Sequence, residues 1–504
     1  MLEATVKKIL QARVYDAACE TPISSAAFLS RRFGNTILIK REDLQPVYSF
    51  KIRGAYNKMA QLTDEQKARG VIAASAGNHA QGLAMAATRM GVKATIVMPR
   101  ITPEIKVAAV RARGAKVVLK GDAFSEAAEH AREQVEEHGY TYIPPFDDID
   151  VLAGQGTVAV EMLRQHADPL DAVFVPVGGG GLIAGVAAYI KYLRPEIKVI
   201  GVESEDSASL KAALDAGRRV TLDQVGVFAE GVAVAQVGEV PFAVMKDLVD
   251  DVITVTADEM CAAVKDIFED TRAVSETSGA LSLAGLKKYI QQTGAQGETL
   301  MCVNSGANTN FDRLQHIAER TSLGEQREAI LAVTIAEKPG SFKKFCRTLG
   351  KRMVTEFSYR YADDSEAHIF VGVQVKPGGD DRQAVIRKLQ EAGYQVEDFT
   401  DNELAKLHIR HLSGGRPSAD VPEELYRFEF PERPGALMNF LTKLPHNWNI
   451  SLFHYRNHGA AYGRVLVGMQ VSNGDSDHVE EHLDAIGYRY WQESDNPAYR
   501  LFMA

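Results

Sequence analysis

The feature that most constrains the fold is a regular alternation of strand-like and helix-like segments between about residues 35 and 310. The β-branched run Val71–Ser75 precedes the helical stretch Ala80–Met90, and the strand-like run Ala94–Met98 follows. The same order returns between Ala172 and Glu203. Strands that alternate with helices form parallel sheets covered by helices, and ligands bind beyond the carboxyl ends of the strands. The sequence therefore predicts an α/β region with parallel sheets.

An internal repeat follows this region. Glu337–Gly340 returns as Glu432–Gly435, 95 residues later, and Val371–Val375 returns as Val467–Val471, 96 residues later. Each copy follows the order strand, Pro-Gly turn, helix, two strands, helix and strand, which is the split βαβ plan. The predicted domains are residues 1–320, a first module at 328–402 and a second module at 424–502. A duplicated scaffold that only mediates subunit contacts is the alternative reading of the repeat.

Length and charge limit the class of protein. The 504 residues suffice for about three domains, and a net charge of -9 argues against nucleic acid or an anionic membrane as a partner. The first residues contain no apolar signal core, and no segment holds 18 uninterrupted apolar residues, so a cytoplasmic protein that handles small metabolites is expected. The four cysteines have no CxxC spacing, which supports neither a zinc site nor a disulfide framework.

Lys51 is the first candidate for chemistry, because the sequence places it at the start of a helix. Apolar residues recur at helical spacing after it, and Ser49 is placed to cap the helix, with Lys51 near the second position. The helix dipole and the guanidinium of Arg53 both favour the neutral amine, and burial would lower the pKa further. A neutral lysine condenses with an aldehyde, so Lys51 is a candidate Schiff-base lysine. The alternative is a solvated lysine on an amphipathic helix.

A glycine run at a strand-to-helix junction is the second candidate. Residues without Cβ let backbone N–H groups approach an anion at the positive end of a helix, which predicts a phosphate cradle. Gly179 and Gly181 followed by Ala184 also fit the dinucleotide fingerprint, with Glu203 about 20 residues on. At this point a nicotinamide cofactor remains an alternative. The run consists of Gly178, Gly179, Gly180 and Gly181, with Leu182 next.

Two further junctions offer polar groups. The segment from Ser75 to Gln81 supplies a hydroxyl, an amide and free N–H groups, which suit a substrate carboxylate and a ring hydroxyl. Ser305, in the segment Asn304–Asn308, follows a strand and could hydrogen-bond a heterocyclic nitrogen. Each junction alone is more often a capped helix start than a site. Three such junctions together with a lysine at a helix start indicate a binding site.

The combined motifs resemble those of the biosynthetic threonine deaminases, or threonine ammonia-lyases, over essentially the whole chain. These are pyridoxal-phosphate enzymes of the fold type II group, which includes serine dehydratases and serine racemase. The resemblance favours pyridoxal 5'-phosphate over a nicotinamide cofactor. It implies an α/β fold with a fold type II catalytic region of two open α/β subdomains, followed by two tandem ACT-like α+β modules.

The resemblance also implies a role for each site residue. Lys51 would be the catalytic residue that binds the cofactor covalently and takes the α-proton, Phe50 would pack against the ring, and Asn78 would bind the ring hydroxyl. Ser305 would face the pyridine nitrogen. The expected cofactor-binding residues are Phe50, Lys51, Asn78, Gly178, Gly179, Gly180, Gly181, Leu182 and Ser305. The expected substrate-binding residues are Ser75, Ala76, Gly77, Asn78 and His79.

The reaction implied is the deamination of L-threonine, with L-serine as a second substrate, to a 2-oxo acid and ammonia. For threonine the product is 2-oxobutanoate, and the step is the first of isoleucine biosynthesis. Isoleucine would inhibit and valine would antagonise it through the ACT-like modules of a homotetramer. A serine dehydratase or racemase of the same fold, or an NAD-binding protein with a metabolite-sensing tail, are the alternatives.

Two departures from the family pattern affect local details. Relatives commonly have Glu-Pro-Ser-Gly-Ala where this chain has Glu276-Thr277-Ser278-Gly279-Ala280, so the turn there is expected to differ. Relatives that bind a divalent metal place an aspartate six residues after an acidic strand-end residue. Here Glu203 is followed at that distance by Ser209, so no metal site is predicted.

Overall fold

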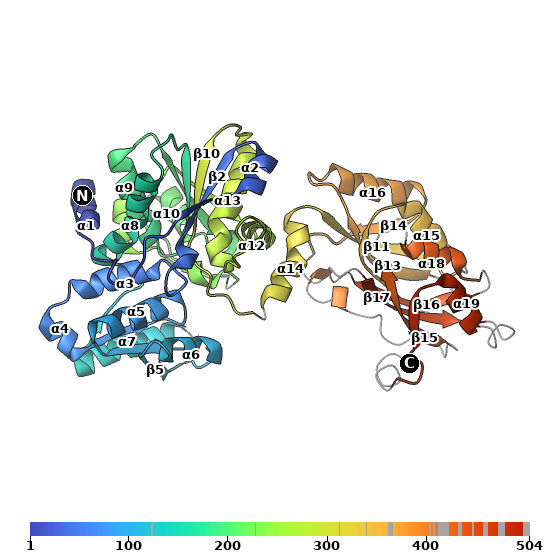
Figure 1. The fold of residues 1–504 in the computed structure, drawn as a ribbon, viewed down its shortest axis with the longest axis horizontal. Coiled ribbons are helices and arrows are strands. Elements are labelled where there is room, and N and C mark those ends of the chain that lie inside the picture. Colours follow the sequence, from blue (N-terminus) through green and yellow to red (C-terminus); the bar gives the residue numbers. More distant parts are fainter. Residues whose placement is uncertain are drawn as a thin grey trace. The chain divides into compact units, whose positions relative to one another are not determined.

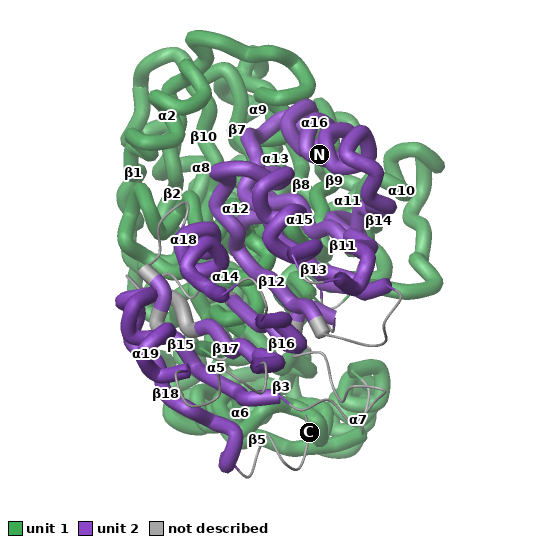
Figure 2. The backbone as a smooth tube through the Cα atoms, turned by 90° about the vertical axis from the view of Figure 1, so that its right-hand side faces the viewer, with its two compact units in different colours: residues 1–321 green, residues 322–504 purple. Residues whose placement is uncertain are grey.

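The computed structural model divides the chain into two compact units, Met1–Thr321 and Ser322–Ala504, which Figure 2 colours separately. The division falls within α14 (Arg313–Gly324). The structure describes all residues except 122–123, 227, 312, 339, 361–365, 403–404, 407–408, 412–422, 432–435, 446–447, 457–461, 472–478 and 497–504.

The first unit contains a six-stranded sheet in the order β1-β2-β10-β7-β8-β9. Figure 1 labels two of its strands, β2 and β10. All neighbouring strands are parallel except β1 and β2. Every residue of the central strand β7 is buried, as expected of a strand covered on both faces. The strands are β1 (Ile23–Ser25), β2 (Thr36–Arg41), β7 (Ala172–Pro176), β8 (Lys198–Ser204), β9 (Asp251–Val255) and β10 (Thr299–Asn304).

Helices cover both faces of this sheet through two separate hydrophobic clusters. One cluster contains α1 (Leu2–Leu10), α8 (Ile149–Gln165), α9 (Gly181–Leu193) and α11 (Glu239–Met245). The other contains α2 (Ala27–Phe33), α12 (Ala257–Thr271) and α13 (Thr277–Thr293). The layered arrangement confirms the prediction of an α/β region with a parallel sheet.

A second, four-stranded parallel sheet with the order β5-β4-β3-β6 forms the other α/β subdomain of this unit. Its strands are β3 (Val71–Ala74), β4 (Ala94–Met98), β5 (Lys116–Leu119) and β6 (Thr141–Tyr142). One hydrophobic cluster holds α3 (Lys51–Ala60), α5 (Asn78–Met90) and α6 (Glu104–Arg111), and another holds α7 (Phe124–His138). The two predicted α/β subdomains are therefore present.

The start of α3 is bound to the loop that follows β10. Ser49 and Gly306 form an isolated antiparallel bridge, and the Phe50 N–H donates to the Ser305 carbonyl at 3.2 Å. The Ala307 N–H donates to the Tyr48 carbonyl at 2.9 Å. These bonds join two segments that lie more than 250 residues apart in sequence, and they bring Lys51 and Ser305 into the same region.

The second unit is built on one eight-stranded sheet with the order β14-β11-β13-β12-β16-β17-β15-β18. All its neighbouring strands are antiparallel. The first copy of the repeat comprises β11 (Glu328–Ala336), α15 (Ser341–Leu349), β12 (Val354–Arg360), β13 (Glu366–Gln374), α16 (Asp380–Glu391) and β14 (Gln395–Asp398). The second comprises β15 (Glu424–Pro431), α18 (Ala436–Lys443), β16 (Asn449–Arg456), β17 (Tyr462–Gln470), α19 (Val479–Ile486) and β18 (Arg489–Gln492).

Each copy has the predicted order of elements, and the two copies join through β12 and β16 into one sheet with one hydrophobic core. The repeat pattern alone did not predict this pairing. The Pro339 position and the turn at 432–435, where the sequence predicts Pro-Gly turns, lie outside the described residues. The boundaries 328–402 and 424–502 for two separate modules stay a prediction.

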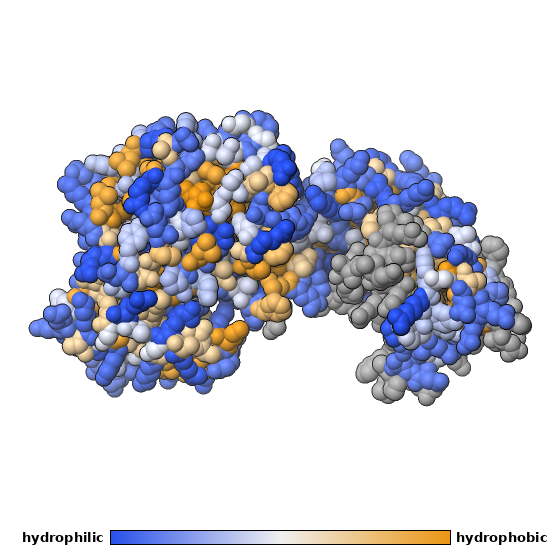
Figure 3. All heavy atoms as spheres, in the orientation of Figure 1, coloured by the Kyte–Doolittle hydropathy of each residue, from blue (hydrophilic) through white to orange (hydrophobic). Residues whose placement is uncertain are grey.

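On the face of the first unit that Figure 3 shows, hydrophobic residues are interspersed among hydrophilic ones. Among the described residues, the helices are all too short or too polar to cross a membrane.

Candidate active site

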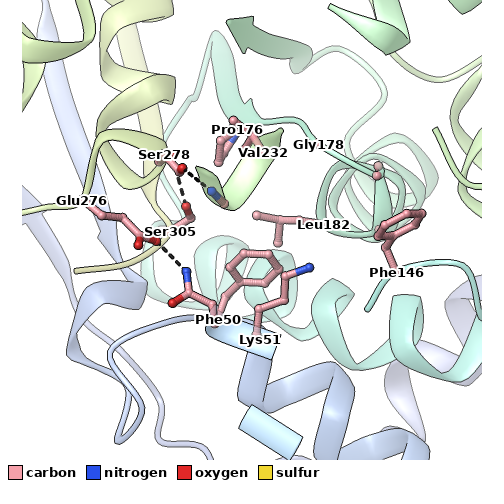
Figure 4. Close-up of a pocket in the computed structure, with 15 residues that line it drawn as sticks. Phe50, Lys51, Phe146, Pro176, Gly178, Leu182, Val232, Glu276, Ser278 and Ser305 are labelled. Atoms are coloured by element: carbon pink, nitrogen blue, oxygen red, sulfur yellow. Dashed lines mark hydrogen bonds between the residues drawn. The ribbon is translucent and has the colours of Figure 1, made fainter. Parts of the chain in front are cut away.

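A pocket lies beyond the carboxyl ends of β7 and β10. Its lining comes from both subdomains (Figure 4). The lining residues are Phe50, Lys51, Asn78, Phe146, Pro176, Gly178, Gly179, Gly180, Gly181, Leu182, Gly231, Val232, Glu276, Ser278 and Ser305.

All nine residues that the sequence suggests for cofactor binding are part of this lining. Among the residues that the structure describes, Ser75, Ala76, Gly77 and His79 lie outside the lining set, at the junction that leads into α5. His79 is buried, its Nε2 contacts the Ile143 carbonyl at 2.9 Å, and burial lowers its pKa to about 3. The imidazole is therefore neutral, and it holds α5 against the segment after β6.

Six lining residues were assigned no role in the site from the sequence. Glu276 and Ser278 lie in a motif that the sequence reveals, and Pro176 directly precedes the segment that contains the glycine loop. Tertiary packing brings Phe146, Gly231 and Val232 to the pocket.

Lys51 places its amine inside the pocket. Burial lowers the amine pKa to about 8, and the charge of Glu276 opposes this shift. Nζ donates to the Pro145 carbonyl at 2.9 Å and lies 5.2 Å from the centre of the Phe50 ring. In Figure 4 the amine points away from Glu276 and Ser305. A pKa near 8 leaves a substantial neutral fraction, which is the form that attacks an aldehyde.

Two details of the predicted helix start are wrong. The structure begins α3 at Lys51, so Lys51 is the first helical residue, and Phe50 occupies the cap position. The Ser49 hydroxyl still accepts from the Lys51 N–H, at 3.4 Å.

The guanidinium of Arg53 is fully buried and paired with Glu42 and Glu161, at 2.7 and 2.6 Å. Its charge is therefore neutralised locally, and burial of the amine is what lowers the pKa of Lys51.

The glycine loop forms a surface that side chains would obstruct. Gly180 has φ +89°, a left-handed conformation that favours glycine. A Cβ at Gly178 would lie 2.9 Å from the Val232 Cα, and a Cβ at Gly179 would overlap the ring of Phe146. The loop leads directly into α9, whose first-turn N–H groups carry the positive end of the helix dipole. These features fit a phosphate group.

Hydrogen bonds connect the polar residues of the pocket. Asn78 Nδ2 donates to Glu276 Oε1 at 2.6 Å, and the Gly231 N–H donates to Ser278 Oγ at 2.9 Å. Ser305 Oγ donates to the Ser278 carbonyl at 3.4 Å. Burial raises the pKa of Glu276 to about 7. The pocket thus combines an amine, an amide, a hydroxyl and a carboxyl group.

Glu203 takes no part in this site. Its carboxylate is fully buried and accepts from the N–H groups of Leu210 and Lys211, at 2.7 and 2.9 Å, at the start of α10 (Ser209–Ala216). A carboxylate held in this way cannot bind a ribose, which removes the structural basis of the nicotinamide alternative. In the described part of the chain, the His, Cys, Asp and Glu side chains form no group of three that could hold a metal ion.

Comparisons with known proteins identify the family. A family profile described as "Pyridoxal-phosphate dependent enzyme" matches residues 14–306, and one for the "C-terminal regulatory domain of Threonine dehydratase" matches residues 319–409 and 414–503. A biosynthetic L-threonine dehydratase of Burkholderia multivorans is 55% identical over 99% of both chains. The chain belongs to the biosynthetic threonine dehydratase family. A member of this family from Salmonella typhimurium is 57% identical over 99% of this chain and 97% of its own length.

Solved structures agree with this family membership. The processed form of threonine deaminase isoform 2 from Solanum lycopersicum has 49% identity and a TM-score of 0.62, covering 63% of this chain and 93% of that chain. Serine racemase from Dictyostelium discoideum has 31% identity and a TM-score of 0.57, covering 61% of this chain and 99% of that chain. The fold type II catalytic region followed by a regulatory region is confirmed.

As a threonine dehydratase family member, the chain is a lyase that uses pyridoxal 5'-phosphate. The residues present fit this cofactor. Lys51 supplies a buried amine with a lowered pKa for the aldehyde, the glycine loop supplies a surface without side chains for the phosphate, and Ser305 supplies a hydroxyl on the opposite side of the pocket from Phe146 (Figure 4).

Proposed function

We propose that this chain deaminates L-threonine to 2-oxobutanoate and ammonia, with L-serine as a second substrate, as the first step of isoleucine biosynthesis in the cytoplasm. The observation that carries the proposal is the amine of Lys51, with a pKa of about 8, in one pocket with the glycine loop. The test is to incubate the purified chain with pyridoxal phosphate and L-threonine and to measure 2-oxobutanoate. Racemised amino acid without 2-oxobutanoate would contradict the proposal and favour a racemase.

Lys51 performs two tasks in the proposed mechanism. When bound, pyridoxal phosphate supplies an electron sink for the α-carbon of the amino acid. Lys51 holds the cofactor in the resting site, and as a free neutral amine it takes the α-proton. The Pro145 carbonyl, 2.9 Å from Nζ, accepts a hydrogen bond from the lysine and stabilises it when protonated. The lowered pKa makes the neutral form available near neutral pH.

The neighbouring groups hold the reactants. The first N–H groups of α5, at Asn78 and His79, point along the helix axis and are the proposed donors to the substrate carboxylate. The amide of Asn78 is the proposed partner of the ring hydroxyl. The first-turn N–H groups of α9 and the glycine loop bind the phosphate in this proposal.

Ser305 is the proposed partner of the ring nitrogen. It is buried directly after β10. With a hydroxyl instead of a carboxylate at this position, a bound cofactor would keep its ring nitrogen largely unprotonated, which would favour loss of the β-hydroxyl over transfer of the amino group.

We expect Ser305→Asp to reduce the rate of 2-oxobutanoate formation by at least about tenfold, because the new carboxylate would keep the ring nitrogen protonated. Ser305→Ala is the matched control, since it removes the hydroxyl without adding charge. It should weaken cofactor binding by roughly tenfold, as expected for one lost hydrogen bond, and retain elimination at saturating cofactor. Equal elimination rates for Ser305→Asp and the wild type would show that the serine has another role.

Regulation by amino acids belongs to the second unit in this proposal. Isoleucine inhibits and valine antagonises, in a homotetramer. The proposed effector site is at the start of α15, where Gly340 has φ +88° and Tyr359 Oη donates to Glu337 Oε2 at 2.6 Å. Phe342, in the first turn of α15, is buried in the core with the centre of its ring 5.0 Å from that of Phe357. A charged residue there would destabilise the unit itself.

A chain that ends after Thr321 is expected to retain dehydratase activity and to lose its response to isoleucine. The first unit has its own sheets and hydrophobic clusters, and serine racemase from Dictyostelium discoideum is a chain of this extent. Coupling between an effector site and an active site is typically about 1–3 kcal/mol, or roughly 5–150-fold in affinity. The measurement is the dose–response of both chains to isoleucine. Inhibition of the shortened chain at the same concentration would place the effector site in the first unit.

A further inference from the structure

Glu276 is a partly buried carboxyl group that lines the pocket, and the mechanism above leaves it without a task. It directly precedes α13, and its side chain lies in the pocket beside Ser305 (Figure 4). Asn78 Nδ2 donates to Glu276 Oε1 at 2.6 Å. Because a buried carboxyl group is costly unless it is paired, this placement calls for a function.

Both the nitrogen and the oxygen of the Asn78 side-chain amide form hydrogen bonds. Asn308 Nδ2 donates to Asn78 Oδ1 at 2.7 Å and to the Val47 carbonyl at 2.7 Å. Glu276 can only accept at Oε1 when ionised, so the amide nitrogen of Asn78 must face it. A flipped amide would place two oxygens against each other and two nitrogens against each other. One N–H of Asn78 remains for a ligand, and its direction follows from Glu276 and Asn308.

The same carboxylate acts on Lys51 by its charge. The negative charge of Glu276 raises the pKa of the Lys51 amine, against the stronger effect of burial. His79 also faces Lys51, but it is neutral. The charge of Glu276 therefore favours the protonated form of Lys51.

Other charged groups near Glu276 come from three elements: Lys106 of α6, Glu230 of η3 (Glu230–Val232) and Arg313 of α14. Glu230 is paired with both cations, with its Oε1 2.9 Å from Arg313 Nη1. Glu230 opposes the effect of both cations on Glu276, and burial is the main cause of the rise of its pKa to about 7.

We propose that Glu276 is a positioning residue of this active site. With Asn308 it orients the Asn78 amide toward the cofactor, and its charge sets the fraction of Lys51 that carries a proton. This inference rests on the proposed function, because it assigns a partner to the proposed Schiff-base lysine.

The test uses the full-length apoenzyme and the pH dependence of the rate at which it takes up pyridoxal phosphate, followed by absorbance. Uptake requires neutral Lys51, so the rate rises with pH through the pKa of this amine. Glu276→Gln removes the negative charge, which lowers the pKa of Lys51. The midpoint of the rise should therefore move to lower pH, by on the order of one unit.

Glu203→Gln is the matched control. Burial raises the pKa of Glu203 to about 7, as it does for Glu276, but the Glu203 carboxylate is fully buried and bound to the start of α10 outside the pocket. This variant should leave the midpoint unchanged. Asn308→Ala should weaken pyridoxal phosphate binding about tenfold, through loss of the Asn78 orientation, at an unchanged midpoint.

Unchanged midpoints in both glutamine variants would overturn the inference. If Glu276→Gln does not fold, Glu276→Asp is the variant that tests the inference, because it keeps the negative charge and shortens the side chain. It should show the wild-type midpoint with weaker cofactor binding, and a shifted midpoint would contradict the charge coupling. Failure of the wild-type chain to take up pyridoxal phosphate or to deaminate threonine would instead refute the proposed function.

Discussion

Lys51→Ala is expected to reduce threonine turnover by at least about 10⁴-fold, because it removes both the covalent attachment of the cofactor and the proposed general base. The structure gives this lysine its reactivity. Burial lowers its pKa from 10.5 to about 8, which provides roughly 300-fold more neutral amine near neutral pH than an ordinary lysine has. The measurement is steady-state formation of 2-oxobutanoate at saturating pyridoxal phosphate.

Lys58→Ala is the matched control for this experiment. Lys58 lies on the same helix but pairs with Asp148 and Asp150, at 2.7 and 3.3 Å, away from the pocket. It should retain turnover close to that of the wild type. Near-normal turnover of Lys51→Ala would instead refute the role of Lys51.

The stability of the Lys51→Ala apoenzyme provides a check on folding. The folded-state pKa of Lys51 lies below its unfolded value, so the unfolded state binds more protons between about pH 8 and 10.5. The contribution of Lys51 to stability therefore rises with pH across this window, and its burial is unfavourable below about pH 8. At neutral pH the variant should gain stability from loss of the buried amine, which thermal unfolding of both apoenzymes can measure.

Gly179→Ala is expected to weaken pyridoxal phosphate binding by about 100-fold and to reduce activity at limiting cofactor to the same extent. A Cβ at this position would overlap the ring of Phe146, and overpacking of this kind typically costs about 1–3 kcal/mol. The added methyl group would also occupy space in the proposed phosphate cradle. Equilibrium dialysis of the apoenzyme against pyridoxal phosphate measures the effect.

Two further variants separate the possible causes. Gly217→Ala serves as the control, because a Cβ at Gly217 meets open space, although its φ of +62° will cost some stability. It should leave cofactor affinity unchanged. The double variant Gly179→Ala, Phe146→Ala lacks the Phe146 ring, so the new Cβ at residue 179 no longer overlaps with it. Persistent loss of affinity there indicates that the methyl group blocks the phosphate, whereas wild-type affinity of Gly179→Ala alone would contradict the assignment of the loop.

Local sequence patterns were sufficient to predict the helices and strands and to point to most of the residues that line the pocket. The alternation of strands and helices, the glycine loop before α9 and the lysine at the start of α3 are short-range signals. Each depends on residues within one or two turns of chain, where steric limits and hydrogen-bonding needs act directly. These signals predicted the parallel sheets, the repeat at a shift of 95–96 residues predicted the order of elements in both copies, and the cofactor followed from the resemblance of the combined motifs to the family.

Tertiary structure alone decided which charges act on the site. Arg53 lies two residues from Lys51, but Glu42 and Glu161 neutralise it, whereas Glu276 is more than 200 residues away in sequence and lies in the same pocket. The pairing of β12 with β16 also arises only in the folded chain. Burial and ion pairing depend on the three-dimensional surroundings of a group, and sequence spacing does not reveal them.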